Sequence, residues 1–427
     1  MHEKHGHFIR IAHNEISVSH PDAVKEILSA PLDKARESAQ CSSIQLQIVN
    51  FRQGTMGVKQ VSKFLANGYS FSNLLRREDE MDVLLEVLKQ RMDHFAEKRQ
   101  AMNVSAFLSY AAHDVAGEML FSNPFGFLKS DSDVGGTIRN FPPLNLYVSI
   151  AGFFYWIHTI LLANPLVTRL GILPTGHIVG ATRKALDERL RNADHRYDVL
   201  SHWLSSHAKH PDKFSTRDIY SNAILHMAAS AETVSIAIQA NLYYLIRHPD
   251  ILRRVREEIQ AAQLKGSCKT CIVSYDDAKE LVYLRACIQE SLRLCAPITL
   301  NLARVVGEEG LAIGGRWFKK GTILSVNPWV MHLSKEYWGP SASNFKPERW
   351  MTDEGVLREK NFIPFGAGYN SCPGQNLAMI EILKIVATIM RDYDLSQDDK
   401  DREWTGKAQF VFVPPPWLLK VSKKEDL

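Results

Sequence analysis

The residues best suited to chemistry lie in one short segment, FGAGYNSCPG, at 365–374. Cys372 precedes Pro373 and a helix-forming sequence, so it lies where free amide N–H groups and the helix dipole stabilise an anion. A thiolate there can bind a metal or attack a substrate. Three glycines, Gly366, Gly368 and Gly374, would let the backbone approach a large flat partner. A phosphate-binding loop is the alternative, but the Lys, Ser or Thr it needs does not follow Cys372.

Two pairs of residues elsewhere also combine charge with apolar surroundings. Glu290 and Arg293 are three residues apart on a predicted helix with apolar flanks, which indicates a buried ion pair that needs further partners. Glu232 and Thr233 interrupt a long apolar segment, where an acid is costly unless it is paired or has a function. The alternative for this second pair is a threonine bonded to the carbonyl four residues earlier, beside a partly solvated glutamate.

The elements that must position these residues are mostly helices. Capping-box spacings, Ser215 with Asp218 and Ser274 with Asp277, predict helices over 219–248 and 277–296, the second ended by Pro297. Apolar periodicity predicts further helices at 19–30, 77–100, 249–263 and 375–393. Short runs bounded by turn residues predict strands at 8–12, 301–306, 311–315 and 322–328. The sequence therefore predicts a mainly α protein with a small β portion.

The composition excludes several classes of function. The chain has 427 residues, 45% of them hydrophobic, and a net charge of +4, which is ordinary for a globular protein and too mild for nucleic-acid binding. Six cysteines are too few for a disulfide framework at this length. Cys268 and Cys271 have the spacing of a zinc site but lack a suitable second pair, which favours incidental cysteines.

One uncharged segment, LYVSIAGFFYWIHTILLA at 146–163, approaches the length of a membrane-spanning helix. Asn164 and Pro165 end it abruptly, and no basic flank is evident. These features favour a buried or interfacial helix over a span. The polar N-terminus lacks the apolar core of a signal peptide.

The pattern F365-x-x-G368-x-N370-x-C372-x-G374 resembles the haem-binding signature of the cytochrome P450 family. The resemblance implies a haem b cofactor whose iron is ligated by Cys372, within a loop that includes Phe365, Gly368, Asn370 and Gly374. It also implies that Arg349, in FKPERW, joins Glu290 and Arg293 in a network that supports this loop. By the same resemblance, Glu232 and Thr233 deliver protons on the opposite haem face, and Arg304 binds a haem propionate.

The similarity extends along nearly the whole chain and is strongest to pisatin-demethylase-type enzymes of fungal secondary metabolism. It implies a single catalytic domain, 1–427, that oxidises a small apolar molecule with electrons from an NADPH-dependent flavoprotein reductase. It further implies a place on the cytosolic face of the endoplasmic reticulum membrane. The segment 146–163 would then either cover the substrate pocket or make peripheral contact with the membrane, and a soluble protein is the alternative. A haem-thiolate isomerase or dehydratase, and a haem-binding protein that has lost activity, are the alternatives.

The chain departs from the family pattern at four places. Asn370 stands where an arginine or histidine usually reaches a haem propionate, and Ser230 replaces a glycine beside the dioxygen site. The segment GVKQVSKFLANGYSF keeps only Lys59 and Lys63 where the family places a tryptophan and arginine for the propionates. The sequence also begins without the usual membrane anchor and proline-rich hinge. Asn370 weakens an expected anchor for haem, and the alternative of lost activity rests on these four departures.

Overall fold

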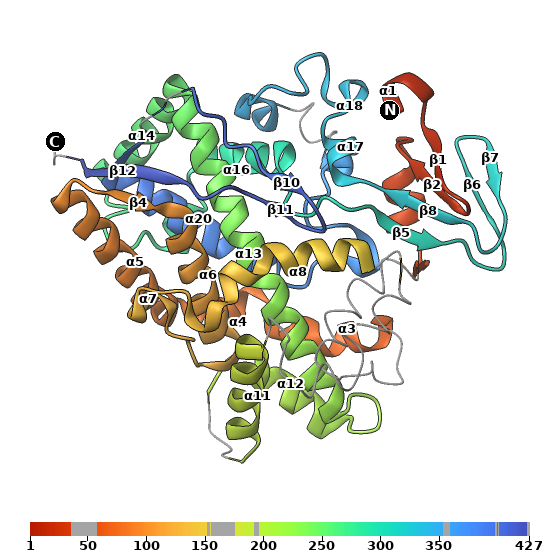
Figure 1. Cartoon of the computed structure of the whole chain (residues 1–427), viewed down its shortest axis with the longest axis horizontal. Helices are drawn as coiled ribbons and strands as arrows, with labels where there is room; N and C mark the ends of the chain where they lie inside the picture. Colours follow the sequence, from red (N-terminus) through yellow and green to blue (C-terminus); the bar gives the residue numbers. More distant parts are fainter. Residues whose placement is uncertain are drawn as a thin grey trace.

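The computed structural model describes residues 1–35, 58–151, 154, 176–191, 196–352, 359–397, 399 and 401–424. A long helix, α13 (Thr216–Arg247), crosses the middle of the molecule and packs along α6 (Val104–Phe121) (Figure 1). The predicted capping box is present at its start, where the Ser215 and Asp218 side chains each accept the other's backbone N–H. In the described part of the chain, α13 is the helix long and apolar enough to cross a membrane, but 61% of its apolar window is buried inside the protein. It is therefore the central core helix.

Other helices surround α13 and form the larger part of the protein. Two of them, α16 and α20, contact it directly and carry or follow the candidate site residues. The predicted helices at 77–100, 249–263 and 375–393 are confirmed as α5, α14 and α20. The remaining helical bounds are α1 (His2–His5), α3 (Val58–Ala66), α4 (Phe71–Leu75), α5 (Glu78–Lys98), α7 (Phe127–Ser130), α8 (Thr137–Ala151), α11 (Gly176–Arg191), α12 (Val199–Lys209), α14 (Pro249–Leu264), α15 (Tyr275–Ala278), α16 (Val282–Leu294), α17 (Pro328–His332), α18 (Lys335–Trp338) and α20 (Gln375–Asp392).

The strands gather mainly at one side of the molecule, beside the N-terminal segment (Figure 1). Within the described residues, one five-stranded sheet has the order β1-β2-β8-β5-β3, with β2 and β8 parallel and the other neighbours antiparallel. A second sheet joins β4, β12 and β9, and two hairpins pair β6 with β7 and β10 with β11. All four predicted strands are confirmed, as β1, β5, β6 and β8. The strand bounds are β1 (Phe8–Ala12), β2 (Glu15–Val18), β3 (Asp33–Lys34), β4 (Ala101–Asn103), β5 (Leu302–Val305), β6 (Leu311–Ile313), β7 (Arg316–Phe318), β8 (Ile323–Val326), β9 (Tyr393–Ser396), β10 (Lys407–Ala408), β11 (Phe412–Val413) and β12 (Leu418–Lys423).

Two predicted helices are wrong in extent. The segment 277–296 is divided into the single turn α15 and the helix α16, because the Glu258 carboxylate of α14 accepts the backbone N–H groups of Tyr283 and Leu284 and starts α16 there. The segment 19–30 forms one short π-helix, η1 (Val24–Leu28), whose buried side chains pack beside β8. In both cases contacts from distant segments override the local helical pattern.

The apolar segment 146–163 is described only at 146–151 and 154, and its remaining residues lie outside the described part of the chain. Its first residues complete α8, where Val148 is buried. Three apolar side chains at four-residue spacing, Leu146, Ile150 and Phe154, are 47%, 48% and 52% exposed. The described beginning of the segment therefore has one buried face and one exposed apolar face.

Candidate functional site

A cavity of about 580 Å³ lies between α13 and the loop that carries Cys372. Most of its wall is apolar, with Leu144 and Val148 from α8, Ile298 after α16, and Phe410 near the C-terminus. The predicted residues Glu232, Thr233, Arg304, Phe365, Asn370, Cys372 and Gly374 all line it. The fold thus brings the predicted thiol, the predicted acid and the predicted cation to a single, largely apolar space.

The cysteine loop is closed by its own backbone. The N–H of Cys372 donates to the carbonyl of Phe365 at 2.8 Å, and the N–H of Gly366 donates to the carbonyl of Ile363 at 3.0 Å. The Cys372 side chain is accessible from the cavity, and the rest of its surroundings are protein. Burial raises the pKa of its thiol, while the N–H groups of Gly374 and Gln375 and the charge of Lys34 oppose that rise. Two backbone donors and a cation therefore offset part of the burial that disfavours a thiolate at this position.

The three glycines of the loop have different roles. Gly366 and Gly374 line the cavity, and an added Cβ at Gly374 would lie 3.9 Å from Cys372 Sγ. Gly368 instead packs on the protein's own backbone: an added Cβ would lie 2.5 Å from the Leu28 carbonyl oxygen and still nearer to Ser29 Cα. The expectation that all three glycines face a flat partner is therefore wrong for Gly368, whose φ of +66° and contact with η1 both require glycine.

Glu290 is fully buried at the centre of a charged network. Its two oxygens accept two hydrogen bonds of 2.8 Å from Arg293, and Oε1 accepts another of 2.8 Å from Arg349 Nε. The Trp350 indole N–H and the Lys346 backbone N–H donate to the same carboxylate, both at 3.0 Å. The extra partners that a buried ion pair needs are thus supplied by the segment that contains Arg349.

One residue that the sequence did not indicate, His332, connects this network to the cysteine loop. Arg293 Nη1 donates to the His332 carbonyl at 2.6 Å, and His332 Nε2 accepts the N–H of Ile363 at 2.8 Å. The carbonyl of Ile363 in turn accepts the N–H of Gly366. Burial lowers the pKa of His332 to about 3, so its ring is neutral and Nε2 can accept. A continuous path of hydrogen bonds therefore runs from Glu290 to the Cys372 loop.

Glu232 and Thr233 lie on α13 at the cavity wall but do not bond to each other. Ser109 on α6 donates to Glu232 Oε2 at 3.2 Å, and Oε1 has no hydrogen-bond partner among the described residues. Burial raises the pKa of Glu232 to about 7. The Thr233 hydroxyl donates to the carbonyls of Ala229 and Ser230, at 2.9 and 3.1 Å. The back-bonded threonine considered above is therefore present, beside an acid that titrates near neutrality.

Some residues that depart from the family pattern line the cavity, and others do not. Asn370 lines the cavity, and Ser230 lines it with its hydroxyl donating to the Met227 carbonyl at 3.4 Å. Lys63 is exposed and lies over the Phe64 ring, 5.1 Å from its centroid. The Lys59 side chain lies outside the described part of the chain. Lys34, which the sequence did not single out, lines the cavity beside Arg304.

A second acid in the cavity wall, Glu381 on α20, was also missed. It is 2% exposed, and its Oε1 has no hydrogen-bond partner among the described residues. Burial raises its pKa to about 8. The signal in the sequence was an acid within the apolar run IEILKIVATI, but helices contain many such acids.

In the Glu381→Gln variant, the free energy of unfolding is expected to fall less steeply with rising pH than in wild type. The folded protein holds a proton on Glu381 between the ordinary pKa of about 4.5 and the raised value of about 8, so wild-type stability falls as pH rises through this window. One such group contributes at most about 1.4 kcal/mol for each pH unit. Urea unfolding from pH 5 to 8.5 would measure the difference, with the exposed Glu403→Gln as control. Parallel curves for wild type and Glu381→Gln would contradict the prediction.

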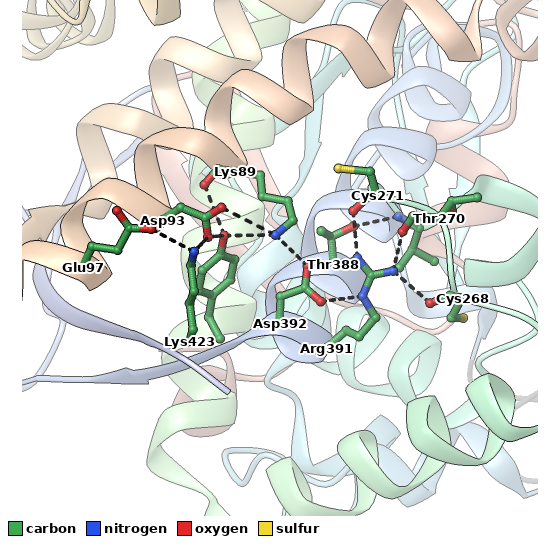
Figure 2. A network of polar contacts seen from close by, with 12 residues as sticks. Lys89, Asp93, Glu97, Cys268, Thr270, Cys271, Thr388, Arg391, Asp392 and Lys423 are labelled. Carbon is green, nitrogen blue, oxygen red and sulfur yellow. Dashed lines mark hydrogen bonds and ion pairs between the residues drawn. The ribbon is translucent and has the colours of Figure 1, made fainter. Parts of the chain in front are cut away.

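The loop that contains Cys268 and Cys271 is organised around the side chain of Arg391. Arg391 Nη1 donates to the carbonyls of Cys268 and Thr270, and its Nη2 donates to that of Cys271, so the loop surrounds a guanidinium (Figure 2). The two sulfur atoms point away from each other on opposite sides of Arg391 (Figure 2). Among the described residues, no group of three His, Cys, Asp or Glu side chains could hold a metal ion. The CxxC spacing here belongs to a structural loop.

Comparison with known proteins agrees with this arrangement. The family model for cytochrome P450 matches residues 1–421. A cytochrome P450 monooxygenase, ACRTS1, of Alternaria alternata is 31% identical over 85% of this chain and 99% of its own length. The cytochrome P450 monooxygenase cicH of Emericella nidulans is 27% identical over 100% of this chain and 88% of its own length. Pisatin demethylase of Fusarium vanettenii is 26% identical over 99% of this chain and 83% of its own length. The chain therefore belongs to the cytochrome P450 family, as its cysteine loop implied, and the mainly α fold with a small β portion is that of the family.

Proposed function

We propose that this chain is a haem-thiolate monooxygenase that oxidises a small apolar molecule through the site around Cys372. Proteins of this family bind haem through a cysteine thiolate and receive electrons from a redox partner. The observation that carries the proposal is the cavity itself, where Cys372 lies in one wall and α13, with Glu232 and Thr233, forms part of the same space.

The residues present fit a haem group. Gly366 and Gly374 leave the cavity wall beside Cys372 without side chains, and the Nε of the buried Arg304 has no hydrogen-bond partner among the described residues. In this proposal Cys372 ligates the iron, with Phe365, Gly368, Asn370 and Gly374 in the loop that holds it. Arg304 binds a propionate. Bound haem would supply the dioxygen activation that this family performs, because thiolate donation favours O–O cleavage.

The chain's own groups would control protons and water. Near neutral pH Glu232 can hold or release a proton at its carboxylate, because burial raises its pKa to about 7 and Ser109 fixes one oxygen. The Thr233 hydroxyl donates to helix carbonyls, so its oxygen can accept a hydrogen bond on the cavity side. The apolar walls from α8 and from the turn between β10 and β11 favour an apolar substrate and exclude water from it.

The supporting network and the partners complete the proposal. Glu290, Arg293 and Arg349 hold the cysteine loop in place through the contacts described above. An NADPH-dependent flavoprotein reductase would supply electrons, and the whole chain 1–427 would act as one catalytic domain. The exposed apolar face of Leu146, Ile150 and Phe154 supports peripheral contact with a membrane through 146–163, on the cytosolic side of the endoplasmic reticulum. The family is typically membrane-associated in fungi.

The ferrous–CO complex of the purified protein tests the proposed thiolate. Wild type should show the red-shifted Soret band of thiolate ligation, and Cys372→His should bind haem without that band. Cys295→Ala is a suitable control, because Cys295 is a buried thiol outside the cavity wall. A wild-type protein that contains haem but lacks the red-shifted band would contradict the proposal. Oxygen-dependent consumption of NADPH with a reductase separates a monooxygenase from an isomerase or dehydratase.

A further inference from the structure

Two cations lie side by side at one edge of the five-stranded sheet and face the cavity. Lys34 on β3 and Arg304 on β5 are direct partners in the antiparallel register. Directly opposed residues of an antiparallel pair project from the same face, with Cβ atoms about 5 Å apart. Both residues line the cavity. The β3–β5 pair therefore directs two positive charges into the space that contains Cys372.

Neither cation has an acidic partner among the described residues. Arg304 is 3% exposed; among the residues that the structure describes, its Nη1 donates to the neighbouring Ala303 carbonyl at 3.0 Å, and its buried Nε has no partner. Within the described part of the chain, no carboxylate lies within ion-pair distance of Lys34 or Arg304. Glu15, the acid of β2 in the same cavity wall, accepts from Asn301 at 3.5 Å, and Asp33 alternates to the exposed side of β3.

This arrangement is unfavourable unless an anion completes it. Like charges directly opposed across a strand pair destabilise a sheet, and a buried charge without a counter-ion is costly. Burial is the main factor that lowers the pKa of both Lys34 and Arg304, and Arg304 also lowers that of Lys34. The charge of Cys372 acts in the opposite direction and raises the pKa of Lys34. The two cations thus form the positive end of a cavity whose thiol is within electrostatic reach.

We propose that Lys34 binds a carboxylate of haem together with Arg304, and that it supplies the cation that Asn370 cannot. Haem carries both of its carboxylates on one edge, so an iron ligated by Cys372 brings them toward nearby cations. Lys63 is exposed on the surface and does not line the cavity. This inference rests on the proposed function, since it requires haem in the cavity. An acidic substrate could offer the same carboxylate chemistry, and the experiment below separates the two sources.

The first experiment measures how fast the ferric protein loses haem to excess apomyoglobin. Lys34→Met should lose haem about tenfold to a hundredfold faster than wild type, the range expected for one charge-assisted hydrogen bond. Lys34→Arg should remain near wild type, and the double variant Lys34→Met/Asn370→Arg should recover most of the retention. Lys25→Met is the control, because the Lys25 side chain is 83% exposed and should leave haem loss unchanged. If Lys34→Met does not accumulate as a folded protein, Lys34→Gln replaces it.

The second experiment asks whether the effect depends on the carboxylates. Wild-type protein reconstituted with haem dimethyl ester should lose it faster than haem, and Lys34→Met should reduce this difference. Equal haem loss from wild type and Lys34→Met would overturn the proposal. The proposal would also be overturned if Lys34→Met lost haem faster but the difference in loss rate between haem and its dimethyl ester stayed the same. That result would mean that Lys34 acts through packing alone. Unchanged haem retention with weaker binding of acidic substrates would assign Lys34 to substrate and also overturn it. Failure of the proposed function is separate, since it would appear as a missing red-shifted band in wild type.

Discussion

Glu290→Ala is expected to reduce the free energy of unfolding by about 3–5 kcal/mol, the range for removal of one partner from a buried ion pair. Arg293 and Arg349 would remain buried, with side chains 0% and 3% exposed, and would lose the carboxylate that all their shared contacts depend on. Because Arg293 also holds His332, the variant should lose haem as well. Urea unfolding and the haem-to-protein ratio would measure both effects.

Asp250→Ala is the matched control for that variant. Asp250 and Arg253 have the same three-residue spacing on α14, but their side chains are 92% and 67% exposed. An exposed pair of this kind contributes less than about 1 kcal/mol. If Glu290→Ala destabilised the protein no more than Asp250→Ala, the network around Glu290 would not be what supports the cysteine loop.

Gly368→Ala should be considerably more damaging than Gly366→Ala. Both glycines have positive φ, +66° at Gly368 and +72° at Gly366. An alanine at either position would therefore introduce a similar backbone strain of roughly 1–2 kcal/mol. Only at Gly368 would the new Cβ also collide with the backbone of Leu28 and Ser29, whereas at Gly366 its nearest neighbour would be 3.6 Å away. Overpacking of this kind adds about 1–3 kcal/mol.

The difference between these two variants isolates the contact between the cysteine loop and η1. Urea midpoints would give the stability difference, and limited proteolysis would show whether the region around Ser29 becomes accessible in Gly368→Ala. Equal losses of stability would mean that η1 moves aside at little cost and that the positive φ alone explains the glycine.

The residues with the strongest local signals could be identified from the sequence. Cys372 with its glycines, and the acid in the apolar helix α13, stand out because their chemistry conflicts with their surroundings. The Ser215–Asp218 capping box was also predictable, because it lies within a single turn. The resemblance to the cytochrome P450 family was confirmed along nearly the whole chain, because the family model matches residues 1–421.

The residues that could not be predicted depend on contacts between distant segments. Lys34 is unremarkable in the sequence and becomes notable only because β3 pairs with β5, about 270 residues later in the chain by the positions of Lys34 and Arg304. His332 connects Arg293 to Ile363 and carries no local pattern. The break between α15 and α16 is made by Glu258 of another helix. Periodicity and capping describe neighbours along the chain, so they carry no information on such contacts.

The path of hydrogen bonds from Glu290 through His332 to Gly366 has a consequence for conformational entropy. The protein's own backbone and side chains fix the cysteine loop. The conformational entropy of this loop is therefore lost when the protein folds and not when it binds a ligand. A binding site that is ordered in advance retains more of its contact energy as affinity. Haem retention in this protein should therefore depend on residues that never touch the porphyrin, and Glu290, about 80 positions before Cys372, is the furthest of them along this path.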